Sequence, residues 1–197
     1  MEYQKEFSNI VGLVSYKELE MLMQLAEGVP NYGKIVEIGS YMGKSTIALA
    51  NSVNQTVDID AIDLFPDETI FLPNIGNPTE KGWPENNKVY YQRQEFIKNT
   101  STYPNIKMIV AGSSRELNYP LIPHIDLLFL DASHRNPSDL EYIQYFMPRM
   151  KPNCIICGHD YGESFPDVVA NVRMLENYYS QTVSLVDTFW WIKVING

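Results

Sequence analysis

Short apolar segments alternate with segments of helical character along most of the chain, and this alternation constrains the fold more than any other feature of the sequence. The apolar segments have the length and composition of strands, and they occupy residues 34–38, 59–64, 106–111, 125–130 and 154–157. Strands that alternate with helices predict a parallel sheet with helices on both faces. We therefore expect an α/β fold with a doubly wound, mostly parallel sheet.

Capping signals and a late β-rich region add detail to this expectation. Ser15 and Glu18 have the spacing of a capping box before the first helix, and Ser138 and Glu141 repeat that spacing before a later one. Two β-rich pieces lie close together near the end of the chain, the second of them at 188–195. Because short connections join antiparallel strands, we expect one late strand to be antiparallel.

The length of 197 residues suits one α/β domain and is short for two. We expect a single domain over residues 1–197, with a helical lead-in at 1–30. Residues 65–88 form a long stretch that contains prolines and has no helix or strand pattern. Loops of that length in compact domains are usually functional or mobile. Two interpretations stay open for this stretch, a lid over the substrate site and a disordered insertion.

The composition argues against several kinds of partner. The formal net charge is −9, whereas surfaces that bind nucleic acid or anionic membranes need clustered Lys and Arg. No apolar run approaches the roughly 20 residues of a membrane span. The polar start of the chain lacks the pattern of a signal peptide, and two cysteines are too few for a disulfide framework. We therefore expect a cytoplasmic protein without nucleic-acid or membrane partners.

The strongest local signal is a glycine-containing turn at 36–46, VEIGSYMGKST, which follows an apolar strand and opens a helix. Glycines in such a turn let the chain bend tightly and let a ligand approach the main chain. The GKS at 43–45 is similar to the end of a phosphate-binding P-loop, but Ile38 stands where that loop has its first glycine. Tyr41 likewise stands at the second glycine of the dinucleotide fingerprint.

Two acids near the turn favour a third kind of ligand. Glu37 beside the turn disfavours a phosphate and favours a cationic ligand such as S-adenosylmethionine, which has a sulfonium and an amino group but no phosphate. Asp63 stands at the predicted end of the second strand, where an acid that binds ribose hydroxyls is expected. The turn and Asp63 together predict an adenosylmethionine site, with a nucleotide site as the rival interpretation.

At this point the chain resembles the class I S-adenosylmethionine-dependent methyltransferases, in particular the catechol O-methyltransferase-like and related small-molecule O-methyltransferase families. The resemblance extends over 34–195 and implies a single Rossmann-like domain. Five segments carry it in the family's order: 37–45, 62–67, 110–115, 125–134 and 155–160. In the family, the first and second motifs hold the methionine and ribose portions of the cofactor, and the third flanks the adenine.

The resemblance implies a set of cofactor-binding residues on these motifs. They are Glu37, Gly39, Ser40, Tyr41, Gly43, Ser45, Thr46, Asp63, Leu64, Gly112, Ser113, Ser114 and Asp131. The chain also departs from the catechol-type pattern. His134 stands where those enzymes have a lysine base, and His159 and Asp160 replace their metal-binding Asp-Asn pair. The family's substrate is therefore not carried over, and the His-Asp pair is more similar to a related group that includes sugar-modifying enzymes.

The candidate catalytic residues follow the fourth and fifth predicted strands. Asp131 and Asp160 are expected at the ends of two neighbouring strands, which lie about 4.8 Å apart. His134 follows Asp131 by three residues, and histidine is a residue type that commonly serves as a general base. One mechanism uses His134 as the base with an aspartate that orients it. The other uses Asp131, His159 and Asp160 as ligands of a divalent metal, magnesium or manganese. Neighbours on a regular strand point to opposite faces, which separates the side chains of His159 and Asp160, so we favour the metal-free mechanism.

The sequence therefore predicts an enzyme that transfers a methyl group from S-adenosylmethionine to a hydroxyl or an amine of a small molecule, with a sugar as one candidate. Two alternatives stay open. One is a P-loop-like nucleotide hydrolase that uses Lys44 and Asp131, and the other is a module that binds adenosylmethionine without turnover. Because related enzymes often dimerise, a homodimer is a further expectation.

Overall fold

The computed structural model of the chain describes residues 7–70, 83–85, 87–122 and 124–195. The helices are α2 (Tyr16–Ala26), α3 (Lys44–Ser52), α4 (Gln92–Thr100), α5 (Ser138–Phe146) and α6 (Pro166–Tyr179), with 3₁₀ turns η1 (Ser114–Glu116) and η2 (Met147–Arg149). The strands are β1 (Lys34–Ile38), β2 (Asp58–Asp63), β3 (Thr69–Ile70), β4 (Val89–Tyr90), β5 (Ile106–Val110), β6 (Ile125–Leu130), β7 (Met150–Gly158), β8 (Ser184–Val186) and β9 (Phe189–Lys193).

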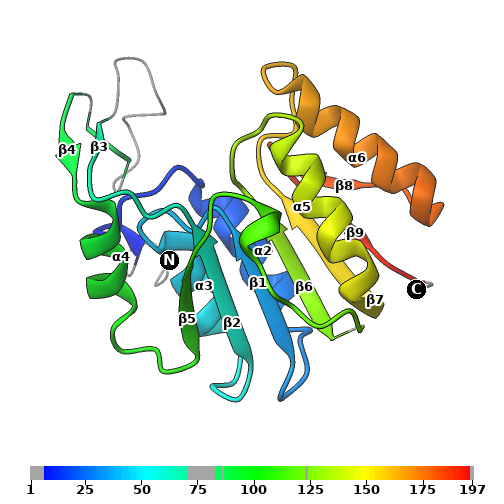
Figure 1. The fold of residues 1–197 in the computed structure, drawn as a ribbon, viewed down its shortest axis with the longest axis horizontal. Helices are drawn as coiled ribbons and strands as arrows, with labels where there is room; N and C mark the ends of the chain where they lie inside the picture. Colours follow the sequence, from blue (N-terminus) through cyan, green and yellow to red (C-terminus); the bar gives the residue numbers. More distant parts are fainter. Residues whose placement is uncertain (1–6, 71–82, 86, 123, 196–197) are drawn as a thin grey trace.

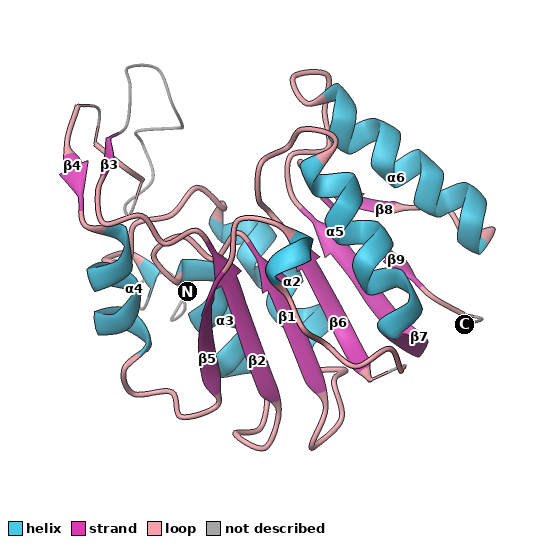
Figure 2. Cartoon of the chain, in the orientation of Figure 1, coloured by secondary structure: helices cyan, strands magenta, loops and turns pink. Residues whose placement is uncertain are grey.

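Within the described residues, the main sheet has the strand order β5-β2-β1-β6-β7-β9-β8 (Figures 1 and 2). The pairs among β5, β2, β1, β6 and β7 are all parallel. Strand β9 lies antiparallel to both of its neighbours, β7 and β8. The prediction of a doubly wound, mostly parallel sheet with a late antiparallel strand is therefore confirmed.

Two apolar layers cover the two faces of the sheet, because successive residues of each strand face opposite sides. On one face, Val36 and Leu128 pack into a cluster with α5 and α6. On the other, Ile35 and Leu127 pack with residues of α2 and α3. Figure 1 shows this arrangement, with α5 and α6 in front of the sheet and α2 and α3 behind it. Among the described residues, none of the helices is long and apolar enough to cross a membrane.

The two predicted capping boxes have different outcomes. The first is confirmed, because the Ser15 side chain accepts from the Glu18 N–H and the Glu18 carboxylate accepts from the Ser15 N–H. The second is wrong. Helix α5 has Pro137 as its N-cap residue and no side-chain capping bond, and Ser138 is already helical. Glu141 forms an ion pair with the Arg115 side chain instead.

The region between β2 and β5 holds structure that the sequence pattern did not indicate. Helix α4 packs Phe96 against Phe65, with 4.6 Å between the ring centroids. Its other apolar residue, Ile97, is exposed, so the segment has no apolar stripe that would predict a helix. Strands β3 and β4 form a separate antiparallel pair at the ends of the predicted lid. Residues 71–82 and 86, most of that lid, lie outside the described residues.

Candidate cofactor and catalytic site

A cavity of about 410 Å³ lies at the carboxyl ends of the parallel strands, where ligands bind in open α/β sheets. Its size is within the usual range for small-molecule sites. The loops that follow β1, β2, β5, β6 and β7 contribute to its wall, and residues 12–14 of the N-terminal segment close one side. The wall includes ten predicted site residues, which are Gly39, Ser40, Tyr41, Ser45, Asp63, Leu64, Gly112, Asp131, His134 and Asp160.

The glycine turn after β1 packs directly against the end of β6. Gly39 has a φ of +93°, and a Cβ added to it would lie 1.9 Å from the carbonyl oxygen of Asp131. Gly43 has a φ of +90° and is the N-cap residue of α3. Both glycines are therefore required by backbone conformation, and Gly39 is required by close approach as well.

Glu37 lies beneath the turn and does not reach the cavity wall. Its side chain is fully buried, and its carboxylate accepts from Ser45 Oγ at 2.5 Å and from Thr46 Oγ1. Burial raises the pKa of Glu37 to about 7, more than the hydrogen bonds from these hydroxyls lower it. Among these three predicted cofactor-binding residues, Ser45 lines the cavity, whereas Glu37 and Thr46 hold the turn from behind.

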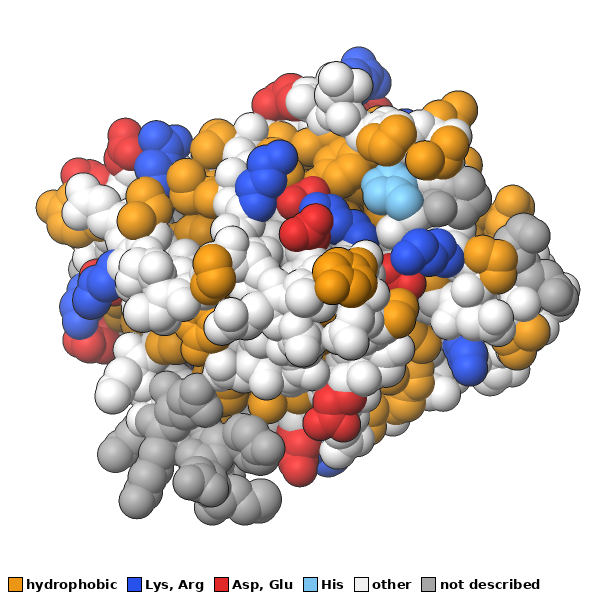
Figure 3. All heavy atoms as spheres, turned by 90° about the horizontal axis from the view of Figure 1, so that it is seen from below, with side chains coloured by type: hydrophobic (Ala, Val, Ile, Leu, Met, Phe, Trp, Pro, Cys, Tyr) orange, Lys and Arg blue, Asp and Glu red, His pale blue; other side chains and the backbone are white. Residues whose placement is uncertain are grey.

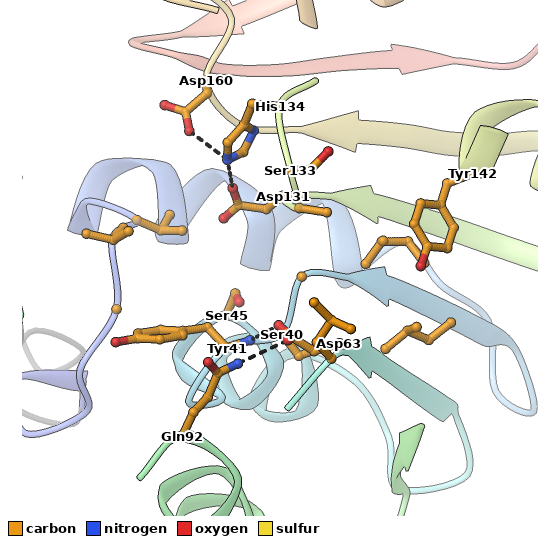
Figure 4. Close-up of a pocket in the computed structure, with 18 of the residues that line it drawn as sticks. Ser40, Tyr41, Ser45, Asp63, Gln92, Asp131, Ser133, His134, Tyr142 and Asp160 are labelled. Atoms are coloured by element: carbon orange, nitrogen blue, oxygen red, sulfur yellow. Dashed lines mark hydrogen bonds and ion pairs between the residues drawn. The ribbon is translucent and has the colours of Figure 1, made fainter. Parts of the chain in front are cut away.

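Asp63 ends β2 with its carboxylate held by three donors. Oδ2 accepts from the Tyr41 N–H at 2.8 Å, and Oδ1 accepts from the Phe65 N–H and from Gln92 Nε2, each at 3.0 Å (Figure 4). A carboxylate has about four acceptor positions, so Oδ2 has room for one ribose hydroxyl in this arrangement. A second hydroxyl on Oδ1 would take the place of the Gln92 amide.

Some of the predicted adenine-side residues line the cavity, and others lie off its wall. Leu64 and Gly112 line the cavity, and they lie so close that a Cβ on Gly112 would be 2.8 Å from Leu64 Cδ2. Ser113 and Ser114 lie off the wall, as does Gly43 of the glycine turn. The Glu116 carboxylate accepts from the Gly112 N–H and from the Ser113 hydroxyl, which orders this turn.

The sequence pattern missed other residues that line the cavity. Tyr142 enters it from α5, and Figure 4 shows this ring on the opposite side of the close-up from Asp160. Lys44 of α3 was considered only for a phosphate site. Thr69 and Gln92 come from the region where no regular structure was predicted. No sequence signal distinguished the wall of a cavity from the apolar core.

The catalytic candidates come together at the ends of β6 and β7. His134 Nε2 lies 3.2 Å from Asp160 Oδ2 and 3.7 Å from Asp131 Oδ1 (Figure 4). Both His134 and Asp160 have left-handed backbone conformations, with φ of 56° and 61°. Such conformations are costly for residues with a side chain and often occur at functional sites. Burial raises the pKa of Asp131, although the nearby histidines act in the opposite direction.

His159 lies behind this group in a buried network of charges. Its Nε2 is 3.1 Å from Glu18 Oε2, and its Nδ1 is 3.3 Å from Asp160 Oδ2 and 3.7 Å from Asp131 Oδ1. Burial alone would lower the pKa of His159, but the charge of Asp131 and the hydrogen bonds to Asp160 and Glu18 outweigh it and raise the pKa to about 11. Thr188 completes the network by donating from its N–H and its hydroxyl to Glu18 Oε1.

The proximity of His159 and Asp160 corrects the expectation that these neighbours point apart. Strand β7 ends at Gly158, so the alternation rule no longer applies beyond it. The left-handed conformation of Asp160 then turns its carboxylate back toward His159. The argument against a metal therefore cannot rest on strand alternation.

The side chains at these strand ends do not suit the predicted metal site of Asp131, His159 and Asp160. Both nitrogens of His159 face carboxylates, and a protonated imidazole has no lone pair for a metal. The structure instead groups Asp131, His134 and Asp160, whose candidate ligand atoms lie within 4.8 Å of one another. A cation there would have to compete with the positive charge of His159, which already neutralises part of the carboxylate charge.

Comparison with known proteins identifies the family. The methyltransferase domain family matches residues 36–161, more than half of the chain. This protein belongs to that family. No match was found among curated proteins.

Solved structures share the fold at low sequence identity. An rRNA methylase from Streptococcus thermophilus is 14% identical with a TM-score of 0.63, covering 94% of this chain and 100% of its own. The precorrin-6y C5,15-methyltransferase from Geobacter metallireducens is 15% identical with a TM-score of 0.63, covering 92% and 80%. The O-methyltransferase TomG from Streptomyces achromogenes, in complex with S-adenosylmethionine, is 14% identical with a TM-score of 0.57, covering 93% and 82%.

The protein is therefore a class I S-adenosylmethionine-dependent methyltransferase, as the motif resemblance implied, and not a nucleotide hydrolase. The cavity suits this cofactor. Its wall contains the carboxylate of Asp63, several apolar residues, the aromatic ring of Tyr142 and Gly39 of the turn after β1. A carboxylate and an apolar surface are the kinds of group that ribose hydroxyls and an adenine ring require.

Proposed function

We propose that this methyltransferase transfers the methyl group to a hydroxyl of a small molecule, with His134 as the general base. The observation that carries the proposal is the position of His134. It lies between Asp131 and Asp160 on the wall of the same cavity that contains the glycine turn and Asp63. A base in that place can reach an acceptor that approaches the reactive end of the cofactor.

The proposed reaction is an in-line displacement. Bound S-adenosylmethionine supplies an electrophilic methyl group on its sulfonium. The acceptor oxygen forms the new bond to carbon as the carbon–sulfur bond breaks, and the hydroxyl proton passes to His134. The protein contributes positioning through the glycine turn and Asp63, and proton removal through the histidine.

The contacts of His134 suggest which nitrogen takes the proton. A neutral imidazole has one nitrogen that donates and one that accepts. Nε2 lies beside the Asp160 and Asp131 carboxylates, so in the proposed mechanism Nε2 carries the hydrogen. Nδ1 then receives the proton of the acceptor, and the imidazolium that forms is stabilised by the two aspartates. Asp160 and Asp131 therefore orient the base and balance its charge.

The charge at this end of the cavity supports a neutral acceptor. Glu18, Asp131 and Asp160 gather around His159, so three carboxylates face one imidazolium and negative charge is in excess. An anionic acceptor would be repelled, whereas a polyol such as a sugar would find hydrogen-bond acceptors. The chain as a whole is acidic, which favours a small molecule over RNA. On the face that Figure 3 shows, at the opposite end of the strands from the cavity, Lys and Arg side chains are scattered among acidic ones.

A metal-dependent version of the reaction is the alternative. In it, Asp131 and Asp160, with His134, would hold a divalent cation, which would lower the pKa of the acceptor hydroxyl. We favour the metal-free version because His159 is already paired with the same two carboxylates. The amine acceptor considered from the sequence also remains compatible with a histidine base.

The test measures transfer of labelled methyl from S-adenosylmethionine to a panel of neutral sugars, phenols, amines and an RNA oligonucleotide. With an acceptor identified, His134→Ala is expected to lower kcat by about 10²- to 10⁴-fold, the usual contribution of a general base. Affinity for S-adenosylhomocysteine should stay within about twofold. His124→Ala is the matched control, because this histidine lies outside the cavity wall and is expected to leave turnover unchanged.

Three results would contradict the proposal. Transfer to RNA alone would exclude the small-molecule acceptor. Full activity of His134→Ala would exclude the histidine as the base. Activity that is abolished by a chelator and restored by magnesium would favour the metal-dependent version.

A further inference from the structure

The wall of the cavity carries a basic side chain that the proposed reaction does not use. Lys44 is the first residue of α3 and is 3% exposed, and it lines the cavity together with residues 12–14. Of the wall residues that the structure describes, Lys44 is the only Lys or Arg. The other ionisable groups that carry charge there are the carboxylates of Asp63, Asp131 and Asp160, with His134 beside the last two.

The surroundings of Lys44 hold its side chain in one place. A Cβ added to Gly12 would lie 2.7 Å from Lys44 Cδ and 2.9 Å from its Cβ, so the glycine leaves room for the lysine stem. The Lys44 ammonium lies 5.2 Å from the centroid of the Tyr16 ring, a distance at which the ring face attracts a cation. The N-terminal segment therefore covers Lys44 and keeps it at the cavity.

The position of Lys44 at the start of a helix adds to its preference for an anion. The N-terminus of a helix has partial positive charge, and α3 begins with Lys44 directly after the left-handed Gly43. The sequence GKS at 43–45 is similar to the end of a P-loop, where the lysine binds phosphate. The methyltransferase cofactor has no phosphate, but it has one carboxylate, on its methionine portion.

We infer that Lys44 binds the carboxylate of the cofactor's methionine portion and so sets the direction in which the cofactor lies. Elsewhere on the described wall the charged groups are carboxylates, which would repel that anion. With Asp63 at the ribose, the methionine portion would extend toward residues 12–14 and Lys44, and the sulfonium methyl would face His134. This inference rests on the cofactor class and not on the proposed acceptor.

The test compares two ligands by calorimetry. S-adenosylhomocysteine has the amino-acid carboxylate, whereas 5′-methylthioadenosine has the same adenosine and a thioether but no amino-acid group. Lys44→Met is expected to weaken binding of S-adenosylhomocysteine by roughly 10- to 100-fold, the usual effect of removing a charged hydrogen-bond partner. Binding of 5′-methylthioadenosine should change by less than about threefold. Lys44→Arg keeps the charge and should recover at least half of the lost binding free energy.

The second ligand also serves as the control for folding. Asp63→Ala should weaken the binding of both ligands, because both contain the ribose. This variant therefore shows what a general loss of the site looks like, against which the effect of Lys44→Met is compared. An equal loss for both ligands in Lys44→Met would assign the lysine a structural role and overturn the inference. Unchanged affinity for S-adenosylhomocysteine would overturn it as well. His134→Ala should change the binding of neither ligand. The calorimetry therefore tests the role of Lys44 independently of whether His134 is the general base.

Discussion

Two parts of the cavity are held by partners at very different separations along the chain. The cofactor side is the glycine turn with Asp63, and the acceptor side of the proposed reaction is the group of Asp131, His134 and Asp160 with His159 behind it. On the cofactor side, Glu37 accepts from a hydroxyl eight residues away, and Asp63 accepts from a backbone N–H 22 residues away. On the acceptor side, His159 meets Glu18 across 141 residues, and Glu18 meets Thr188 across 170. These hydrogen bonds of the cofactor side are therefore closer along the chain, whereas the buried charges behind the acceptor side come together only when the two ends of the chain meet.

The two sides also differ in the forces that hold them. Backbone N–H groups and hydroxyls position the carboxylates of the cofactor side, and these neutral donors keep their protons over the whole working pH range. The acceptor side depends on ion pairs among buried groups, which are costly to break when one partner is removed. We therefore expect the loss of an ion-pair partner of His159 to change stability with pH, and the loss of the Asp63 carboxylate to change ligand affinity.

The largest effect is expected where the two sides touch. Gly39→Ala would place a Cβ 1.9 Å from the Asp131 carbonyl oxygen at a φ of +93°, so the turn and the end of β6 must separate. We expect a loss of about 4 kcal/mol or more in the free energy of unfolding, measured by urea denaturation. Gly162→Ala is the matched control, because its added Cβ would meet nothing within 4 Å, and it should change stability by less than about 1 kcal/mol. Similar stabilities for the two variants would contradict the close contact.

A smaller but pH-dependent effect is expected from Glu18→Gln. Burial alone would raise the pKa of Glu18, but its bonds to His159, Ser15 and Thr188 outweigh that effect and lower it from 4.5 to about 2. A lowered carboxyl pKa stabilises the fold above about pH 4.5, and this stabilisation is lost as the pH falls toward 2. Because His159 has its pKa raised to about 11, its own contribution is complete below 6.5 and is lost as the pH rises toward 11.

The wild-type protein and Glu18→Gln should therefore differ most at about pH 5 to 6, by about 3 kcal/mol, the typical cost of breaking a buried ion pair. The difference should shrink below pH 4. Thermal or urea unfolding across this pH range measures it. Glu20→Gln, an exposed position on the same helix, is the control. A difference that stays constant down to pH 2.5 would mean that Glu18 does not act through its charge.

The smallest effect is expected from Asp63→Ala on the cofactor side. The loss of its carboxylate should weaken the binding of S-adenosylhomocysteine by roughly 1–3 kcal/mol, the usual value for a hydrogen bond to a charged group. Turnover at saturating cofactor should fall less than in His134→Ala. Asp67→Ala, an exposed acid paired with Arg93, is the comparison and should leave affinity unchanged. Unchanged calorimetric affinity in a folded Asp63→Ala protein would remove this residue from the site.

The difference between the two sides also explains which parts of the site could be predicted. The capping box of Ser15 and Glu18 is a local pattern, and the structure contains it. The second role of Glu18, as the partner of His159, has no local signal, because nothing in the spacing of either residue refers to the other. Helix α4 was missed for a related reason. It buries one large apolar side chain, Phe96, against a loop, so it has no periodic stripe.

By itself, the sequence determined the parallel sheet, the late antiparallel strand, the glycine turn after the first strand and the position of Asp63 at the end of the second. These features follow from burial and backbone conformation, which leave periodic or short-range patterns along the chain. Only the tertiary structure decided that Glu37 lies beneath the turn, that Lys44 lines the cavity, and that Glu18 joins His159 beside Asp131 and Asp160. Contacts between distant residues depend on how helices and strands pack, because packing brings together side chains whose separation in the sequence carries no information about their separation in space.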